Sequence, residues 1–158
     1  MDGSMRPAPS GSEGTRPSPT LLYLVKQVEL AVRAGLDEVL RPVEITPLQS
    51  TALTVLERRS DLSTAQLARN SFVTDQSASD MVTAMRERGL IARLPDPNDR
   101  RRRVLRLTAA GQDLLDAVRD KVDGVETRML SPLAPAEAAD LRRYLTRCRA
   151  ALSEHAPH

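Results

Sequence analysis

The fold is decided by the stretch Arg93–Leu107, which reads RLPDPNDRRRRVLRL. Two apolar segments that alternate with polar residues, 90–94 and 103–107, flank a turn rich in proline and aspartate, and this pattern is typical of a β-hairpin. Four consecutive arginines, Arg100–Arg103, follow the turn at the hairpin tip. Because four like charges repel one another there, they indicate a surface that meets an anionic partner.

The positive charge of the chain is concentrated in this hairpin. From Arg93 to Arg106 there are six arginines and two aspartates, a net charge of 6 − 2 = +4, whereas the whole chain carries +2. The remainder therefore sums to 2 − 4 = −2. A positive finger on a nearly neutral body favours a polyanion such as nucleic acid as the partner.

Helical periodicity lies on both sides of the hairpin. Apolar residues recur every three to four positions, and each such segment begins with a recognisable helix start. The predicted helices begin at Leu21, Thr46, Ser63, Thr74, Thr108 and Ala136. The first ends before Pro42, and Gly89 ends the fourth. Thr46-Pro47-Leu48-Gln49 and Ser63-Thr64-Ala65-Gln66 both have the spacing of a capping box.

The order of these elements predicts a mainly α-helical fold with a small β-hairpin wing. The two short helices that start at Ser63 and Thr74 have helix-turn-helix spacing, and a basic hairpin directly after such a pair makes a winged helix-turn-helix. Dimerisation helices from both termini complete the expected architecture. The predicted divisions are a flexible tail over 1–20, a helical dimerisation region over 21–44 and 109–155, and a winged helix-turn-helix over 45–108. Residues 1–4 precede a second methionine and are either native chain or a remnant of cloning.

Other residue types exclude several classes of function. The single cysteine, Cys148, excludes an internal disulfide and a multi-cysteine metal site. The only histidines, His155 and His158, stand at the C-terminus, so we expect no catalytic triad, no metal site and no cofactor. No apolar run approaches the ~18 residues that span a bilayer, and no signal peptide is visible. We therefore expect a cytoplasmic protein that is not an enzyme and does not bind a membrane.

Three motifs resemble the MarR (multiple antibiotic resistance regulator) family. They are STAQLA at 63–68, RGLI at 88–91, and DPNDRR at 96–101 followed by LTAAG at 107–111. The resemblance runs from about Leu21 to Leu152. It implies an obligate homodimer, pseudo-palindromic double-stranded DNA sites, and repression that a small molecule or an oxidant relieves. The family's Asp-x-Arg pattern falls on Asp99 and Arg101, which implies that Arg101 enters the minor groove while Asp99 helps to position the wing.

The remaining DNA contacts are expected from the wing and from the start of the fourth helix. Arg100, Arg102 and Arg103 suit phosphate contacts, although Arg103, like Arg106, is equally consistent with a solvated charge along the strand. Short polar side chains at the helix start can approach base edges, and Gln76 is the candidate for an adenine edge. Asp75 fits either a helix cap or an acceptor for a cytosine amino group. The predicted set is completed by Ser63, Thr74, Ser77 and Ser79.

Two expectations keep alternatives open. The apolar stripes at 21–40, 114–129 and 141–152 can pack inside one chain or against a second copy. An effector pocket, expected by family analogy, would be lined by Tyr23, Leu48, Leu53, Met81 and Leu115, and each of these also fits a plain core position. The competing function is a winged-helix module that binds DNA without sequence preference, as an architectural element, or that contacts protein.

Overall fold

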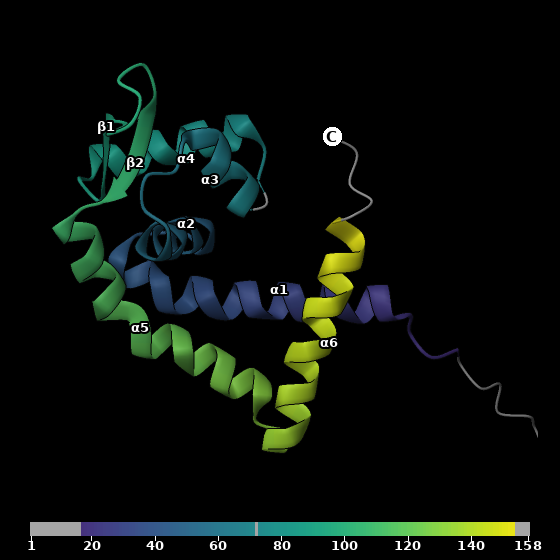
Figure 1. The fold of residues 1–158 in the computed structure, drawn as a ribbon. Coiled ribbons are helices and arrows are strands. Elements are labelled where there is room, and N and C mark those ends of the chain that lie inside the picture. The colour runs from purple at the N-terminus through teal and green to yellow at the C-terminus, as the bar shows by residue number, and fades with distance from the viewer. Residues whose placement is uncertain (1–16, 72, 154–158) are drawn as a thin grey trace, which may run out of the picture.

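The computed structural model describes residues 17–71 and 73–153 (Figure 1). Its elements are α1 (Leu21–Leu40), the 3-10 turn η1 (Arg41–Val43), α2 (Pro47–Arg58), α3 (Thr64–Ser71), α4 (Asp75–Glu87), β1 (Ile91–Pro95), β2 (Arg103–Leu107), α5 (Ala109–Leu130) and α6 (Pro135–Ser153). This order confirms the predicted mainly α-helical class with one hairpin. Of the predicted tail, residues 1–16 lie outside the described residues, and so does the proposed cloning remnant at residues 1–4.

Side-chain caps set the helix starts, as the sequence predicts. The Thr46 hydroxyl accepts from the backbone N–H of Gln49 at 3.1 Å, and the Gln49 side chain accepts from the Thr46 N–H at 3.0 Å. This reciprocal box, with Pro47 in the first turn, starts α2. Thr108 starts α5 in a similar way, since its hydroxyl accepts from the N–H of Gly111 at 3.1 Å. These bonds satisfy N–H groups that a helix start otherwise leaves without partners.

The hairpin is a two-stranded antiparallel sheet that joins α4 to α5. Ile91 pairs with Leu107 and Pro95 pairs with Arg103, which leaves 96–102 as the connecting loop. The chain enters β1 through Gly89, whose φ of 70° lies in the left-handed region that glycine adopts without strain. In Figure 1 the hairpin stands beside α4, and its tip projects on the side away from α2.

The core gathers around α2, which contacts α1, α3, α5 and β2. The largest fully buried side chains of the core come from several elements; they are Leu40, Leu53, Leu67, Met85, Val104 and Leu105. This core holds α3, α4 and the hairpin against one another. It therefore fixes where the polar face of α4 lies relative to the wing.

Large apolar side chains remain exposed at the other end of the molecule. The first half of α1 exposes Leu21, Leu22, Val25 and Val28, and within the described chain no residue of α6 is buried. Figure 1 shows α6 on the side of the molecule opposite the hairpin. The apolar stripe predicted for the last helix therefore packs little within one chain, and Cys148 on that helix is exposed.

Candidate nucleic-acid interface

Helices α3 and α4 form the predicted helix-turn-helix through small and apolar contacts. Leu67 and Ala68 of α3 and Ala78 and Met81 of α4 are all buried. The α3 start has the predicted capping box, because the Ser63 hydroxyl accepts from the Gln66 N–H at 3.2 Å and the Gln66 side chain accepts from the Ser63 N–H at 2.9 Å. The Ser63 hydroxyl is thus part of the cap, and its contact with DNA stays a prediction.

Thr74, rather than Asp75, caps α4. The Thr74 hydroxyl accepts from the backbone N–H of Ser77 at 3.2 Å and donates to the Ser77 hydroxyl at 3.0 Å. Asp75 is the first residue of the helix, and its carboxylate suits the positive end of the helix dipole. The interpretation of Asp75 as the cap is therefore wrong, although it lies only one position away.

The rest of α4 has two different faces. Ala78, Met81, Val82 and Met85 are buried against the core. The opposite face is exposed and polar; it carries Gln76, Ser79, Asp80 and Thr83. The predicted candidates Gln76 and Ser79 thus lie on the accessible side of the helix, where base edges can be reached.

The wing loop is held by its two aspartates. The Asp96 carboxylate accepts from the Asn98 N–H at 2.8 Å, and the Asp99 carboxylate accepts from the Arg101 N–H at 3.0 Å. The Asp96 N–H also donates to the Arg102 carbonyl at 2.9 Å across the loop. Asp99 therefore positions the backbone of Arg101 and leaves its guanidinium free to extend.

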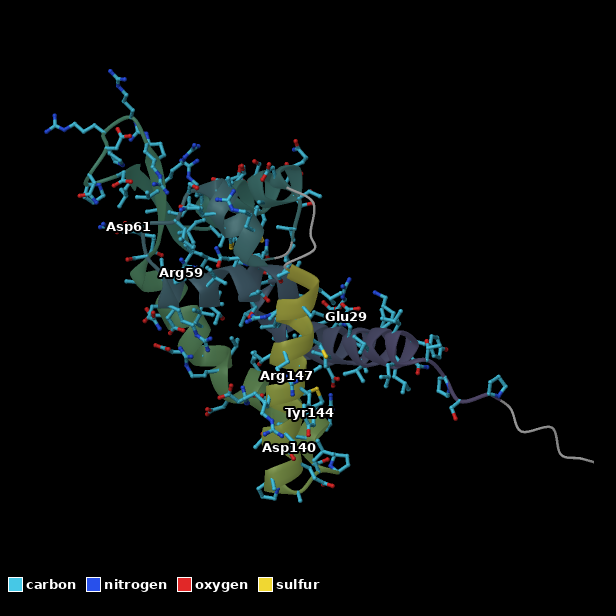
Figure 2. The ribbon with its side chains drawn as sticks, turned by 45° about the vertical axis from the view of Figure 1, so that its right-hand side comes forward. Glu29, Arg59, Asp61, Asp140, Tyr144 and Arg147 are labelled. Atoms are coloured by element: carbon cyan, nitrogen blue, oxygen red, sulfur yellow. The ribbon has the colours of Figure 1, made fainter. Side chains whose placement is uncertain are left out.

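The four tip arginines differ in what they contact. Within the described residues, no ion pair or side-chain hydrogen bond engages the guanidinium groups of Arg100, Arg101 and Arg103. The Arg102 guanidinium, by contrast, donates to the Gln66 side chain and lies 3.7 Å from Asp96. Figure 2 shows long nitrogen-tipped side chains that reach outward from the hairpin tip. Arg102 is partly engaged by the protein, and its predicted phosphate contact stays a prediction.

The base of the wing is attached to the loop between α2 and α3. The Arg106 Nε donates to the Asp61 carboxylate at 2.6 Å, and the Leu105 N–H donates to the Leu62 carbonyl at 2.8 Å. The hydrogen bond from Arg106 lowers the pKa of the Asp61 carboxyl group below its usual value. Figure 2 places Asp61 beside the hairpin. Arg106, expected as a phosphate contact or a solvated charge, is thus ion-paired within the protein and helps to fix the angle of the wing.

The five predicted effector-pocket residues do not line one cavity. Leu53, Met81 and Leu115 belong to the hydrophobic core, and Tyr23 is exposed near the start of α1. Leu48 does line a cavity, of about 760 Å³, between α1, the start of α2 and the helix-turn-helix. Leu53, Met81 and Leu115 thus take the plain core position that the sequence left open, and an effector pocket that includes the other two residues stays a prediction.

The cavity beside Leu48 has polar as well as apolar walls. Its lining is Glu29, Val32, Arg33, Leu36, Thr46, Pro47, Leu48, Thr51, Ser71 and Val73. The Ser71 hydroxyl is buried and has no hydrogen-bond partner among the described residues. A buried polar group without a hydrogen-bond partner destabilises a fold.

The sequence analysis did not predict the contacts of Asp61 with Arg106 and of Asp80 with Gln76. It also did not predict that Arg102 would contact Gln66. Asp80 had a local signal, because it stands four residues after Gln76 on one helix face. Asp61 and Arg102 had none, since their partners lie 45 and 36 residues away along the chain. In the part of the chain that the structure describes, no three His, Cys, Asp or Glu side chains are grouped to hold a metal, and no helix is long and apolar enough to cross a membrane. His155 and His158 lie outside the described residues.

Comparison with known proteins places these features in context. Residues 44–102 match the model of the MarR family. HTH-type transcriptional repressor Rv2887 of Mycobacterium tuberculosis is 27% identical over 123 residues, which cover 78% of this chain and 88% of the relative. A probable transcriptional regulator from Pseudomonas aeruginosa has a similar fold, with a TM-score of 0.74 and 27% identity over 81% of this chain and 96% of the other. MepR of S. aureus in its DNA-binding conformation has a TM-score of 0.75 and 25% identity over 84% and 98% of the two chains.

Proposed function

Because the chain belongs to the MarR family of winged helix-turn-helix transcriptional regulators, we propose that it is a dimeric repressor that binds an inverted-repeat operator. In this proposal residues 45–108 contact double-stranded DNA, and 21–44 with 109–155 make the dimer. Repression follows if the bound dimer blocks access to a promoter. The proposal is supported by relatives that are named transcriptional repressors.

One observation carries the proposal: α4, whose polar face is exposed, packs against strand β1 of the wing, whose arginine-rich tip is also exposed. Contacts between α4 and β1 hold the two elements together, and α3 also packs against α4. A helix with an exposed polar face fits the major groove, and a hairpin beside it reaches the adjacent backbone or minor groove. The winged helix-turn-helix, residues 45–108, forms the reading head, and it can thus contact both grooves at once.

Affinity and specificity come from different parts of this head. The first turn of α4 contains one acidic residue, Asp75, and no basic one. The free guanidinium groups of Arg100, Arg101 and Arg103 supply the charge that neutralises phosphates of the duplex. The wing therefore provides most of the salt-dependent affinity, and α4 provides base readout.

A second copy of the chain would cover the exposed apolar surface of α1 and α6. Leu22 is 83% exposed and Leu145 is 50% exposed, which is unusual for leucines on structured helices of a soluble monomer. A twofold dimer buries the same patch on both copies. Two heads about 34 Å apart, one helical turn of DNA, would then match an inverted repeat.

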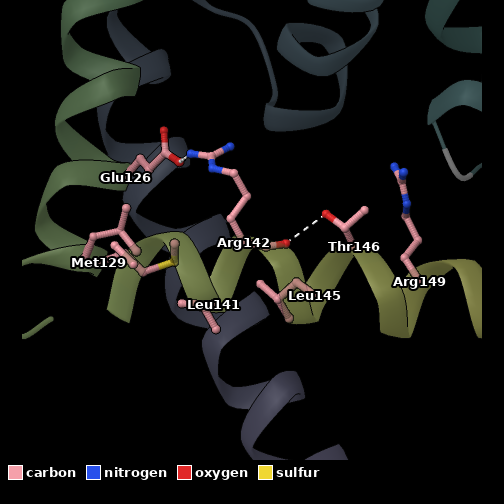
Figure 3. A pocket seen from close by; sticks show the side chains of 9 residues that line it. Glu126, Met129, Leu141, Arg142, Leu145, Thr146 and Arg149 are labelled. Atoms are coloured by element: carbon pink, nitrogen blue, oxygen red, sulfur yellow. Dashed lines mark hydrogen bonds and ion pairs between the residues drawn. The ribbon is translucent and has the colours of Figure 1, made fainter. Parts of the chain in front are cut away.

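A groove between α5 and α6 lies on this same surface (Figure 3). Its volume is about 280 Å³, and Met129, Leu141 and Leu145 form its apolar wall. At one rim the Arg142 guanidinium pairs with Glu126 at 3.1 Å. An apolar groove with a polar rim suits the packing of a partner helix, and it supports placing the dimer contact here.

The proposed effector site is the cavity beside Leu48 rather than the predicted set of five residues. It lies between the dimerisation helix α1 and the reading head. A small amphipathic molecule would find apolar walls from Val32 and Leu36, and polar side chains from Thr46 and Thr51. A ligand in this place can change the angle between α1 and the head, which sets the spacing of the two heads on DNA.

DNA titrations test the proposal. The chain should bind the intergenic DNA next to its own gene at least ~10³-fold more tightly than a scrambled duplex of equal length at one fixed salt concentration. Fluorescence anisotropy with labelled duplexes measures both. If the two curves superimpose, the chain is the alternative, an architectural or protein-binding winged-helix module.

A further inference from the structure

The recognition helix α4 is acidic, although it faces a polyanion in the proposed function. It carries Asp75, Asp80 and Glu87 against one arginine, Arg86. All four residues are exposed. A carboxylate gains nothing from phosphates, but it accepts a hydrogen bond from a base amino group. The charge of α4 therefore indicates base selection rather than general attraction.

Asp80 is distinguished from the other two carboxylates by its partner. The Gln76 Nε2 donates to the Asp80 carboxylate at 3.1 Å, across one turn of α4. Both residues lie on the face opposite the buried Ala78 and Val82. Asp75, in contrast, lies in the first turn, where the positive helix end compensates its charge.

This hydrogen bond decides which way the Gln76 amide is turned. The oxygen and nitrogen ends of an amide have almost the same shape, so a free glutamine can present either end to a base. An ionised carboxylate only accepts hydrogen bonds. Asp80 therefore holds the nitrogen end of Gln76 towards itself, and the Oε1 acceptor is left to meet the DNA.

The Gln76–Asp80 pair offers mainly acceptors to the major groove. Adenine N6 and cytosine N4 are donors there, whereas guanine O6 and N7 and thymine O4 are acceptors. We propose that Asp80 is a specificity-determining residue, which orients Gln76 so that the pair selects an amino base, adenine or cytosine, on the contacted strand and rejects guanine and thymine. This inference rests on the proposed function, because it assumes that α4 enters the major groove.

Selection from a random duplex library tests the inference with the full chain. The wild-type protein should enrich a motif in which one position of each half-site is restricted to adenine or cytosine on one strand. Asp80→Asn keeps the shape, removes the charge and adds a donor, so it should raise the acceptance of guanine or thymine at that position about tenfold. Gln76→Ala should flatten the preference at the same position.

A matched control separates base reading from charge. Asp120→Asn removes one negative charge from an exposed position of α5, outside the reading head. It should leave the enriched motif unchanged and alter only the overall affinity. Circular dichroism of each variant checks that the helices are retained, which is expected because the altered side chains are exposed.

The outcomes that overturn the inference are distinct from those that overturn the proposed function. If Asp80→Asn and Gln76→Ala enrich the wild-type motif without change, or if the position accepts guanine or thymine in the wild type, Asp80 does not set specificity. In that case the regulator still binds its operator. If the wild-type protein enriches no motif at all, sequence-specific binding itself fails, and this inference fails with it.

Discussion

Arg101 combines a fixed backbone with a free side chain. Asp99 holds its N–H at 3.0 Å, and no described residue engages its guanidinium. The neighbouring Arg102 contacts Gln66 and Asp96 instead. A guanidinium presented in this way is suited to a narrow minor groove, where the negative potential is strongest.

Replacing Arg101 by alanine should weaken operator binding about tenfold to hundredfold and leave the dimer intact, because the change removes an inserted charge at an exposed loop. Anisotropy titration at one salt concentration measures the loss. Arg103→Ala is the matched control; it should weaken binding to all sequences alike and lower the salt slope by about one. Operator affinity that is unchanged in Arg101→Ala would refute the assignment of the wing.

At the scale of elements, the start of α5 packs unusually closely on the end of the hairpin. A Cβ added to Gly111 would lie 2.2 Å from the Leu90 carbonyl oxygen and 2.7 Å from Leu107 Cδ1. The Thr108 hydroxyl also donates to the Gly89 carbonyl at 2.6 Å. Helix α5 and the hairpin therefore have a fixed relative orientation at this corner. The start of α5 helps to set the direction of the wing.

Gly111→Ala should destabilise the fold by about 3 kcal/mol, because the clash with the Leu90 backbone exceeds the gain in helix propensity of about 1 kcal/mol. Urea unfolding followed by circular dichroism, at one protomer concentration, measures the change. Gly124→Ala is the control on the same helix, since nothing lies within 4 Å of its added Cβ. It should be neutral or stabilising by about 1 kcal/mol; equal losses in both variants would mean that packing at Gly111 is not the cause.

At the scale of the whole molecule, buried and exposed apolar residues divide between the two ends. The reading head has a closed core around α2, whereas α6 has no buried residue in the described part of the chain. A helix that presents Tyr144, Leu145 and Leu152 to water gains stability only when another surface covers it. The proposed dimer would cover these side chains, and its twofold symmetry would match the proposed inverted repeat.

Leu145→Asp should convert the dimer to a monomer at micromolar concentration, because it places a charge in the proposed contact while sparing the core. Sedimentation or light scattering measures the mass. Leu94→Asp makes the same change at an exposed leucine of the hairpin and should leave the dimer unaffected. A wild-type protein that is monomeric under these conditions would contradict the proposed assembly.

The helices, the hairpin and the arginine cluster were predictable because each is a local property of the chain. Caps such as Thr46 with Gln49 and Ser63 with Gln66 act over three residues, and the wing is a turn between two alternating segments. Gln76 could be proposed as a DNA contact from its place at the start of the fourth helix, whereas the role of Arg101 was implied by the resemblance of the wing to the MarR family. The sequence left Asp75 open as a helix cap or an acceptor for a base, and the structure shows that Thr74, one residue earlier, is the cap.

Only the tertiary structure decided which side chains already have partners within the protein and are not free to bind DNA or a ligand. Arg102 turns to Gln66 and Arg106 to Asp61, and Leu53 and Leu115 fill the core instead of an effector pocket. The two arginine contacts depend on partners that folding brings close from 36 or more positions away along the chain. For the leucines, hydrophobic periodicity predicts that a side chain is buried, but it does not predict which residues or ligand will cover it. The sequence by itself determined the elements and the charge of the wing, whereas packing determined which arginines stay free and where a cavity remains.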